Sequence, residues 1–256
     1  MFQIQFPSYD QARKNFRKLV ETWQGHSNRT ITKEELKTQI QMCRQLWVYH
    51  LCFDPEKLLR DGYIRPFSDL APRKHSMQWE IDKLVGLDQY VFLSFGAPVV
   101  APASEELIVC YSRRHLQREF RYPISWFSWG DLYQAEIREA LDSYSRAIFP
   151  VSWLPLVAGW FSALFYSDPL HAAAEKWRIP NTRGFFFRGP EIKVMNPIPL
   201  KHACAFLIEE ELELSSSLNK LLRKFDVPLI RIPPGNAPRY WDSIRRLTAL
   251  RDTKTA

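Results

Sequence analysis

The chain has 256 residues, of which 46% are hydrophobic and 14% aromatic, and its net charge is +7. This composition excludes an intrinsically disordered chain, because it supplies enough apolar side chains for a sizeable core. The length predicts one large domain or a domain with an appendage. The excess of 35 Lys and Arg over 28 Asp and Glu favours anionic partners such as nucleic acid or a membrane surface, and ordinary solubility explains it equally well.

Two helices are expected before the first strand. Residues 8–24 place apolar side chains on one helical face and begin with a capping-box pattern, and Thr32 opens a second helix with the same pattern. We expect residues 1–46 to form a helical appendage and residues 47–256 to form the main domain.

Short apolar runs bounded by Gly, Pro and polar residues predict strands. The first is followed by a short helix, which Asp54 caps at its start and Gly62 ends. Few helices among many short strands, without regular βαβ alternation, predict the α+β class. The expected strands are Trp47–Cys52, the extended segment Tyr63–Pro66, Tyr90–Phe95, Leu107–Tyr111, a strand that begins at Glu191, Ala203–Ile208 and Val227–Ile232.

The segment Ala147–Ser167 carries no charged residue and is long enough to span a bilayer. Pro150, Pro155 and Gly159 interrupt it, and it has no basic flank that would set a topology. We therefore expect a buried helix with an irregular start, with a membrane span as the alternative.

The cysteines and histidines do not predict a metal site. The four cysteines are widely spaced without a C-x-x-C pair, and three lie in apolar runs, which is typical of buried thiols in a reducing compartment. The six histidines have no metal-ligand spacing, so no metal is expected. The N-terminus has no basic region followed by an apolar core, which predicts no secretory signal and a cytoplasmic protein.

Glu191 begins a strand that is expected to be buried on both faces. A carboxylate at such a place is costly unless something pairs with it or uses it. It is therefore a candidate functional group, and a surface residue at the start of a strand is the alternative.

Four segments resemble, in order, the DarT-like ADP-ribosyltransferases. They span about Trp47 to Trp241 and read VYHLCFDPEKLLRDGYIRP, DQYVFLSFGAPVV, RGPEIKVMNPIPLKHACAFLIEE and VPLIRIPPGNAPRYW. The resemblance implies a split β-sheet core, with helices around it, that binds NAD in a cleft. It implies an enzyme that transfers ADP-ribose from NAD to a nucleobase in DNA, which we expect to be single-stranded, and releases nicotinamide. Members of this family act as toxins or in phage defence, and an antitoxin protein restrains them.

The resemblance also implies roles for individual residues. Glu191 is the catalytic carboxylate, which stabilises an oxocarbenium-like transition state or takes a proton from the attacking base nitrogen. His50 holds the cofactor and takes part in catalysis, and a hydrogen-bonded core histidine is the alternative. Ser94 lies at the end of the next core strand, where its hydroxyl either meets the nicotinamide or is satisfied by the backbone. Tyr90 is a further expected contact of the cofactor.

An arginine that contacts cofactor phosphate and substrate is the part of the family pattern that this sequence does not place cleanly. Arg65 is a candidate for a cofactor contact and Arg73 for a catalytic one, and Lys74 is possible. Simple solvation is the alternative for each of these loop cations.

Residues 111–122 form the densest basic and aromatic run in the chain. Arginines hold phosphates and exposed rings stack on unpaired bases, which suits a single-stranded substrate whose base is out of the stack. A solvated helix face with aromatics in the core is the alternative. The residues expected to bind nucleic acid are Arg113, Arg114, Arg118 and Arg121, and Arg239, Arg245, Arg246 and Arg251 extend the surface.

Two other functions stay open at this point. One is a non-catalytic module of the same fold that binds NAD or nucleic acid, and the other is a transferase that acts on RNA or protein. The sequence contains no Walker A, G-x-G-x-x-G, H-E-x-x-H or G-x-S-x-G motif, so the chemistries that use these motifs are not expected.

Overall fold

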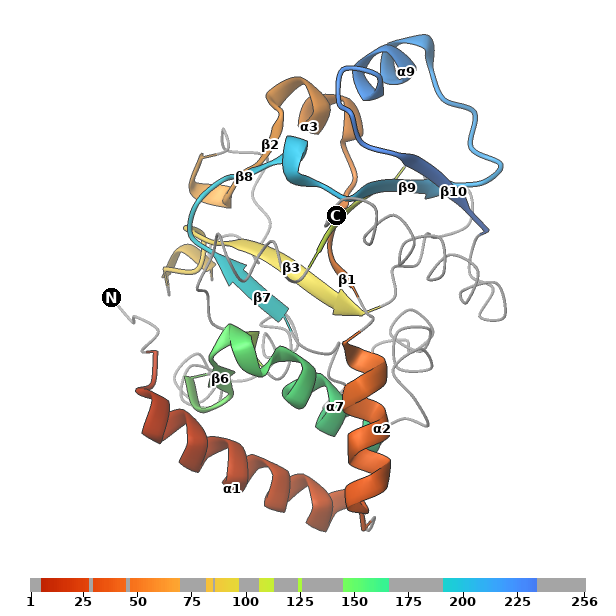
Figure 1. The fold of residues 1–256 in the computed structure, drawn as a ribbon. Coiled ribbons are helices and arrows are strands. Elements are labelled where there is room, and N and C mark those ends of the chain that lie inside the picture. Colours follow the sequence, from red (N-terminus) through yellow and green to blue (C-terminus); the bar gives the residue numbers. More distant parts are fainter. Residues whose placement is uncertain are drawn as a thin grey trace.

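The computed structural model describes residues 6–27, 30–44, 47–69, 82–84, 86–96, 106–112, 124–125, 145–165 and 191–233. In this part of the chain, eight strands form one sheet and helices pack against it, which confirms the predicted α+β class (Figure 1). Figure 1 shows α1 (Tyr9–Ser27), α2 (Lys33–Cys43) and α7 (Leu154–Phe165) at one end of the molecule, and α3 (Pro55–Asp61) with α9 (Ser216–Leu222) at the other.

The strands of the large sheet follow the order β10-β9-β4-β1-β3-β7-β5-β6, and a separate pair is formed by β2 and β8. Within the large sheet, β9 and β10 are parallel and the other neighbours are antiparallel. The bounds are β1 (Trp47–Cys52), β2 (Tyr63–Ile64), β3 (Val91–Gly96), β4 (Leu107–Tyr111), β5 (Ile124–Ser125), β6 (Ile148–Phe149), β7 (Glu191–Val194), β8 (Ile198–Pro199), β9 (Ala205–Glu209) and β10 (Leu229–Ile232).

The sheet divides between β1 and β3. β1 pairs with β4 along Val48–Cys52, but it pairs with β3 only along Trp47–Tyr49. Beyond that row β1 continues with β4, whereas Val91–Leu93 of β3 continue with β7. We call this division the fork, formed by His50–Cys52 on β1 and Val91–Leu93 on β3. It leaves four strands on each side, and it is the split that the resemblance implies.

Side chains alternate between two cores on the two faces of the sheet. Val48, Val109 and Phe206 lie in the larger core, to which α1, α2, α3, α7 and α9 all contribute. Trp47 and Tyr49 lie in the smaller core on the other face, with residues of β4, β9 and β10. Both faces of this half of the sheet are therefore covered, which is why its strands read as continuous apolar runs.

The charge-free segment forms β6, a 3-10 turn η3 (Val151–Trp153) and α7, which is the buried helix with an irregular start that the sequence predicts. Among the described residues, no helix is long and apolar enough to cross a membrane. α7 packs very closely against α2, because Gly159 leaves room for Ile40. The assignment of residues 1–46 as an appendage stays a prediction.

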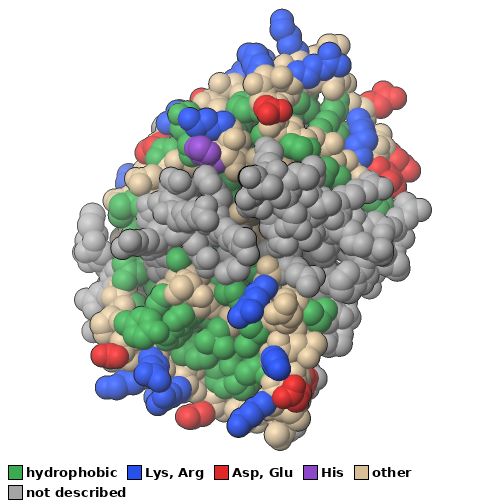
Figure 2. All heavy atoms as spheres, viewed as in Figure 1, with side chains coloured by type: hydrophobic (Ala, Val, Ile, Leu, Met, Phe, Trp, Pro, Cys, Tyr) green, Lys and Arg blue, Asp and Glu red, His purple; other side chains and the backbone are tan. Residues whose placement is uncertain are grey.

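Aromatic rings join α1 to the start of α7. The ring of Trp153 lies 5.1 Å from that of Tyr9 and 5.9 Å from that of Phe16, and it stacks on Phe149 at 6.1 Å between centroids. Figure 2 shows hydrophobic side chains gathered on this face, in the region of α1 and α7. Aromatic pairs at these distances stabilise the packing of α1 beyond simple burial.

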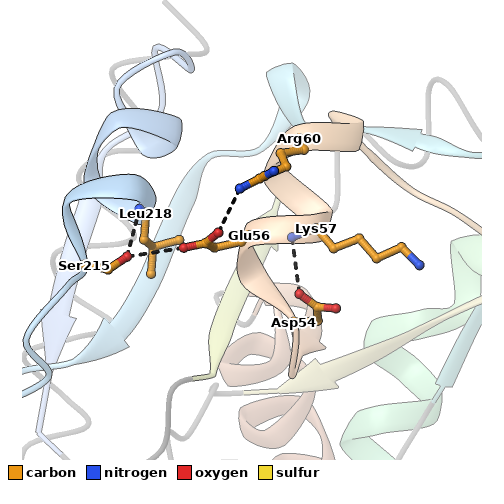
Figure 3. Close-up of polar contacts among 6 residues, drawn as sticks. All are labelled: Asp54, Glu56, Lys57, Arg60, Ser215 and Leu218. Atoms are coloured by element: carbon orange, nitrogen blue, oxygen red, sulfur yellow. Dashed lines mark hydrogen bonds and ion pairs between the residues drawn. The ribbon is translucent and has the colours of Figure 1, made fainter.

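The short helices α3 and α9 are capped by side chains and tied to each other (Figure 3). Asp54 Oδ1 accepts a hydrogen bond from Lys57 N at 3.3 Å, and Gly62 ends α3 with a positive φ of 73°. Ser215 Oγ accepts from Leu218 N at 3.1 Å and donates to Glu56 Oε1 at 3.3 Å. The cap of α9 thus also bonds to α3, so that one hydroxyl positions both helices.

Candidate active site

Ser94 and Glu191 lie directly opposite one another in the sheet. The register pairs Tyr49 on β1 with Ser94 on β3, and Ser94 with Glu191 on β7. Residues that face each other in antiparallel strands direct their side chains to the same face. Tyr49, Ser94 and Glu191 therefore form one row across the sheet, and this row is the last one before the fork.

A lysine on the same strand lies next to Glu191. Lys193 Nζ lies 2.8 Å from Glu191 Oε2, and the side chain of Lys193 is fully buried whereas that of Glu191 is 14% exposed. The ammonium also lies 5.5 Å from the ring centroid of Phe92, its neighbour on β3. Burial lowers the pKa of Lys193 well below its usual 10.5, so this amine holds its proton less firmly than a surface lysine does.

His50 sits at the fork and takes the place of a missing backbone bond. Its Nδ1 lies 3.1 Å from the carbonyl oxygen of Phe92, on the part of β3 that no longer pairs with β1. A carbonyl only accepts, so Nδ1 carries a proton and donates it. Burial lowers the pKa of His50 below 6.5, and the bond to Phe92 opposes that shift. The ring is therefore neutral near pH 7, and its Nε2 is a hydrogen-bond acceptor.

The side chain of His50 points to one face of the sheet and that of Glu191 to the other, which limits how one ligand can contact both. His50 follows Tyr49 on β1, so strand alternation directs it to the face opposite Tyr49, Ser94 and Glu191. A ligand that contacts both His50 and Glu191 has to reach through the fork between β1 and β3. The two groups stand on neighbouring rows of the same sheet, which keeps this reach short.

Arg65 and Tyr90 each contact other side chains of the fold. Arg65 follows β2, where its Nε lies 3.4 Å from Asp61 Oδ2 and its guanidinium lies 5.5 Å from the centre of the Tyr63 ring. Tyr90 precedes β3, is buried in the larger core and meets the ring of Phe6 edge-on at 6.1 Å. Neither placement brings the side chain into the row of Glu191, and their roles as cofactor contacts stay predictions.

Several predicted site residues lie outside the described residues. These are Arg73 and Lys74, the nucleic-acid candidates Arg113, Arg114, Arg118 and Arg121, and the C-terminal arginines from Arg239 to Arg251. Within the described ranges, no group of three or more His, Cys, Asp and Glu side chains is arranged to hold a metal ion.

Lys193 is the residue that sequence reasoning missed. In the segment Glu191–Val194 the lysine follows the glutamate by two positions, so a strand directs both side chains to the same face. That spacing is the signal that would have linked them. It was obscured because a lysine in an apolar strand is usually taken to mark an exposed position.

No family model matches the chain, and no curated protein matches it. The chain is similar to two solved structures from Thermus sp. 2.9, with a TM-score of 0.42 for each and with 16% and 15% sequence identity. Both are structures of DarT. One is in complex with ADP-ribosylated single-stranded DNA and the other with NAD+, and each alignment covers 72% of this chain and 93% of the DarT chain.

At this identity and TM-score the likeness assigns no activity to this chain, because function resides in individual sites rather than in folds.

Proposed function

We propose that this protein transfers ADP-ribose from NAD to a nucleobase of single-stranded DNA and releases nicotinamide. The observation that carries the proposal is the row Tyr49–Ser94–Glu191 beside the fork. Three predicted site residues, His50, Ser94 and Glu191, come from distant parts of the sequence and stand on three adjacent strands, within one row of each other.

The chemistry requires one bond to break and one to form at the same carbon. The bond between the nicotinamide nitrogen and C1′ of the ribose breaks, and its electron pair leaves with nicotinamide, which becomes neutral. A nitrogen of the base then bonds to C1′ and loses a proton. Glu191 serves both stages, because its carboxylate stabilises the oxocarbenium-like ribose and accepts the proton.

His50 supports the same reaction by binding. With Nδ1 bonded to the Phe92 carbonyl, the ring presents Nε2 as an acceptor in a fixed orientation. A ribose hydroxyl is a matching donor. Because NAD would touch His50 through Nε2 and would also contact the partly exposed carboxylate of Glu191, the nicotinamide ribose would lie across the fork.

DNA as the acceptor is supported by the resemblance of four ordered segments and by the basic and aromatic run at residues 111–122. Single-stranded DNA is favoured over duplex DNA because the reacting base has to be out of the stack. Action as a toxin, restraint by an antitoxin and a cytoplasmic location are further predictions from the same resemblance.

The test is incubation of the purified protein with NAD and a set of single-stranded oligonucleotides, followed by mass spectrometry. The expected result is a gain of one ADP-ribose per modified strand and release of one nicotinamide for each gain. Glu191→Gln should reduce the rate at least about 100-fold, because the amide carries no charge to stabilise the transition state. Glu213→Gln, at an exposed glutamate outside the row, is the matched control and should keep the wild-type rate.

Two outcomes would contradict the proposal in different ways. Transfer to RNA or protein with none to DNA would contradict the target class. No release of nicotinamide under any condition would contradict the proposal that the protein is an enzyme.

A non-catalytic module that binds NAD is the second candidate, because the structure already gives both site groups a partner within the fold. His50 bonds to the Phe92 carbonyl, and Glu191 pairs with Lys193. Calorimetry with NAD separates the two candidates. Binding without nicotinamide release, unchanged in Glu191→Gln, would favour the module.

A further inference from the structure

Glu191 and Lys193 form an asymmetric ion pair. Both belong to β7, and the contact joins Lys193 Nζ to one carboxylate oxygen, Oε2, at 2.8 Å. The lysine side chain is completely buried, whereas the glutamate retains 14% of its side-chain exposure. A molecule that approaches this row from outside can therefore reach the carboxylate but cannot reach the ammonium.

The lysine is held on a second side by β3. Phe92 stands opposite Lys193 in the register, and its ring centroid lies 5.5 Å from Nζ. A cation at this distance is attracted to the ring face, which restricts the flexible lysine chain to one orientation. The position of the ammonium is therefore restrained, and its contact with Oε2 restrains the orientation of the Glu191 carboxylate.

Stability alone is a weak reason for a lysine at this position. A buried ion pair gives little or no net stability over apolar side chains of similar volume, because both charges lose their hydration. A methionine or leucine would fit the alternation of β7 at lower cost, as Ile192 and Val194 do on its other face. A functional role for Lys193, acting through the carboxylate of Glu191 that it contacts, explains its presence better.

We propose that Lys193 is a positioning residue, which holds Oε2 of Glu191 so that Oε1 points toward the bound ribose of NAD. This inference rests on the proposed function and deepens it. Precise direction matters in such a site, because a displacement of about 1 Å in a reacting group lowers a rate by about 100-fold.

The test compares Lys193→Met with Lys193→Gln in the assay of NAD and single-stranded DNA. Lys193→Met removes the contact, so kcat should fall about 100-fold while KM for NAD stays within about 3-fold of the wild type. Lys193→Gln keeps a hydrogen-bond donor without the charge and should retain more of kcat than Lys193→Met. Lys220→Met, the same substitution at an exposed lysine on α9, should match the wild type.

The pH dependence of kcat gives a readout that a purely structural lysine would not move. A carboxylate that loses an opposite charge within 4 Å gains a proton more readily. The acid limb of the profile should therefore shift upward by about one pH unit in both Lys193 variants. Circular dichroism establishes that each variant is folded, and Lys193→Gln keeps the test open if Lys193→Met does not fold.

Wild-type kcat with an unshifted acid limb in a folded Lys193 variant would overturn the inference and leave the proposed function standing. Absence of transfer by the wild-type protein would overturn the proposed function and the inference with it. Reduced kcat, little-changed KM and a shifted limb, together with partial recovery in Lys193→Gln, are the results that the positioning role predicts.

Discussion

At His50 the sheet replaces a backbone hydrogen bond with one from a side chain. β1 leaves β3 after Tyr49, and the imidazole reaches the Phe92 carbonyl that the departing strand no longer meets. The same bond fixes the tautomer, since Nδ1 donates and Nε2 accepts. One residue thus bridges the division of the sheet and, in the proposed function, presents Nε2 to NAD in a fixed orientation.

The burial of His50 predicts a pH dependence of stability. Its pKa is lowered in the folded protein, so as the pH falls through about 6.5 the unfolded chain binds a proton before the folded one does. The contribution of His50 to the unfolding free energy is therefore fully present above this pH and decreases as the pH falls below it. In His50→Gln the loss of unfolding free energy between pH 7.5 and 5.5 should be smaller, by on the order of 1 kcal/mol.

Chemical denaturation at the two pH values measures this difference. His202→Gln, at an exposed histidine, is the matched control and should keep the wild-type pH dependence. An equal loss of stability in His50→Gln and the wild type would show that the imidazole protonates alike in both states.

Single residues differ in how far the sequence predicts them. Glu191 and His50 stand out because a charged or titratable group inside an apolar strand needs a reason. Their relative facing was not predictable, since it depends on the register between strands that are far apart in the chain. The burial of Lys193 was not predicted either, because the interior that buries it is assembled from segments that are far apart in the chain.

At the scale of elements, the contact between α2 and α7 depends on one glycine. A Cβ built on Gly159 would lie 2.6 Å from Ile40 Cγ1 and 3.1 Å from Ile40 Cα. Because backbone atoms are involved, rotation of the side chain alone cannot relieve the overlap. Close approach of the two helices is therefore only possible without a side chain at position 159.

Gly159→Ala should lower the unfolding free energy by about 1–3 kcal/mol, through displacement of α2 from α7. Thermal unfolding measures the loss. Gly25→Ala is the matched control, because no heavy atom lies within 4 Å of its added Cβ and it is in α1. That variant should gain up to about 1 kcal/mol from helix propensity. A Gly159→Ala protein as stable as the wild type would contradict this packing.

The hydroxyl of Ser215 supports two helices at once (Figure 3). Ser215→Ala removes the cap of α9 and the bond to Glu56, so we expect a loss of about 1 kcal/mol in urea denaturation. Ser217→Ala lies on the exposed side of α9 and should change stability little or increase it slightly. Equal stability of the two variants would contradict the role of the cap.

Elements with local signals were predicted closely. β1 and β4 begin and end where their apolar runs do, and Asp54 and Gly62 bound α3 as expected. An extended segment after Gly62 was expected, but the pairing of β2 with β8 was not predicted, because Tyr63–Ile64 and Ile198–Pro199 pair across more than a hundred residues of the chain.

For the whole molecule, the order of the strands decides what the site can do. Sequence patterns give strands but not their neighbours, so the placement of β3 between β1 and β7 was not predicted. This order sets Ser94 opposite Glu191 and opens the fork beside them. Transfer of ADP-ribose by the proposed mechanism requires this arrangement of three strands, and no single residue supplies it.

A crystal structure of Glu191→Gln with NAD tests that arrangement most directly, because the variant should bind NAD without consuming it. We predict that the nicotinamide ribose lies across the fork, with one hydroxyl bonded to His50 Nε2 and the side chain at position 191 within hydrogen-bond reach of the same ribose. NAD bound elsewhere, or bound with His50 and residue 191 facing away from one common ligand, would contradict the account.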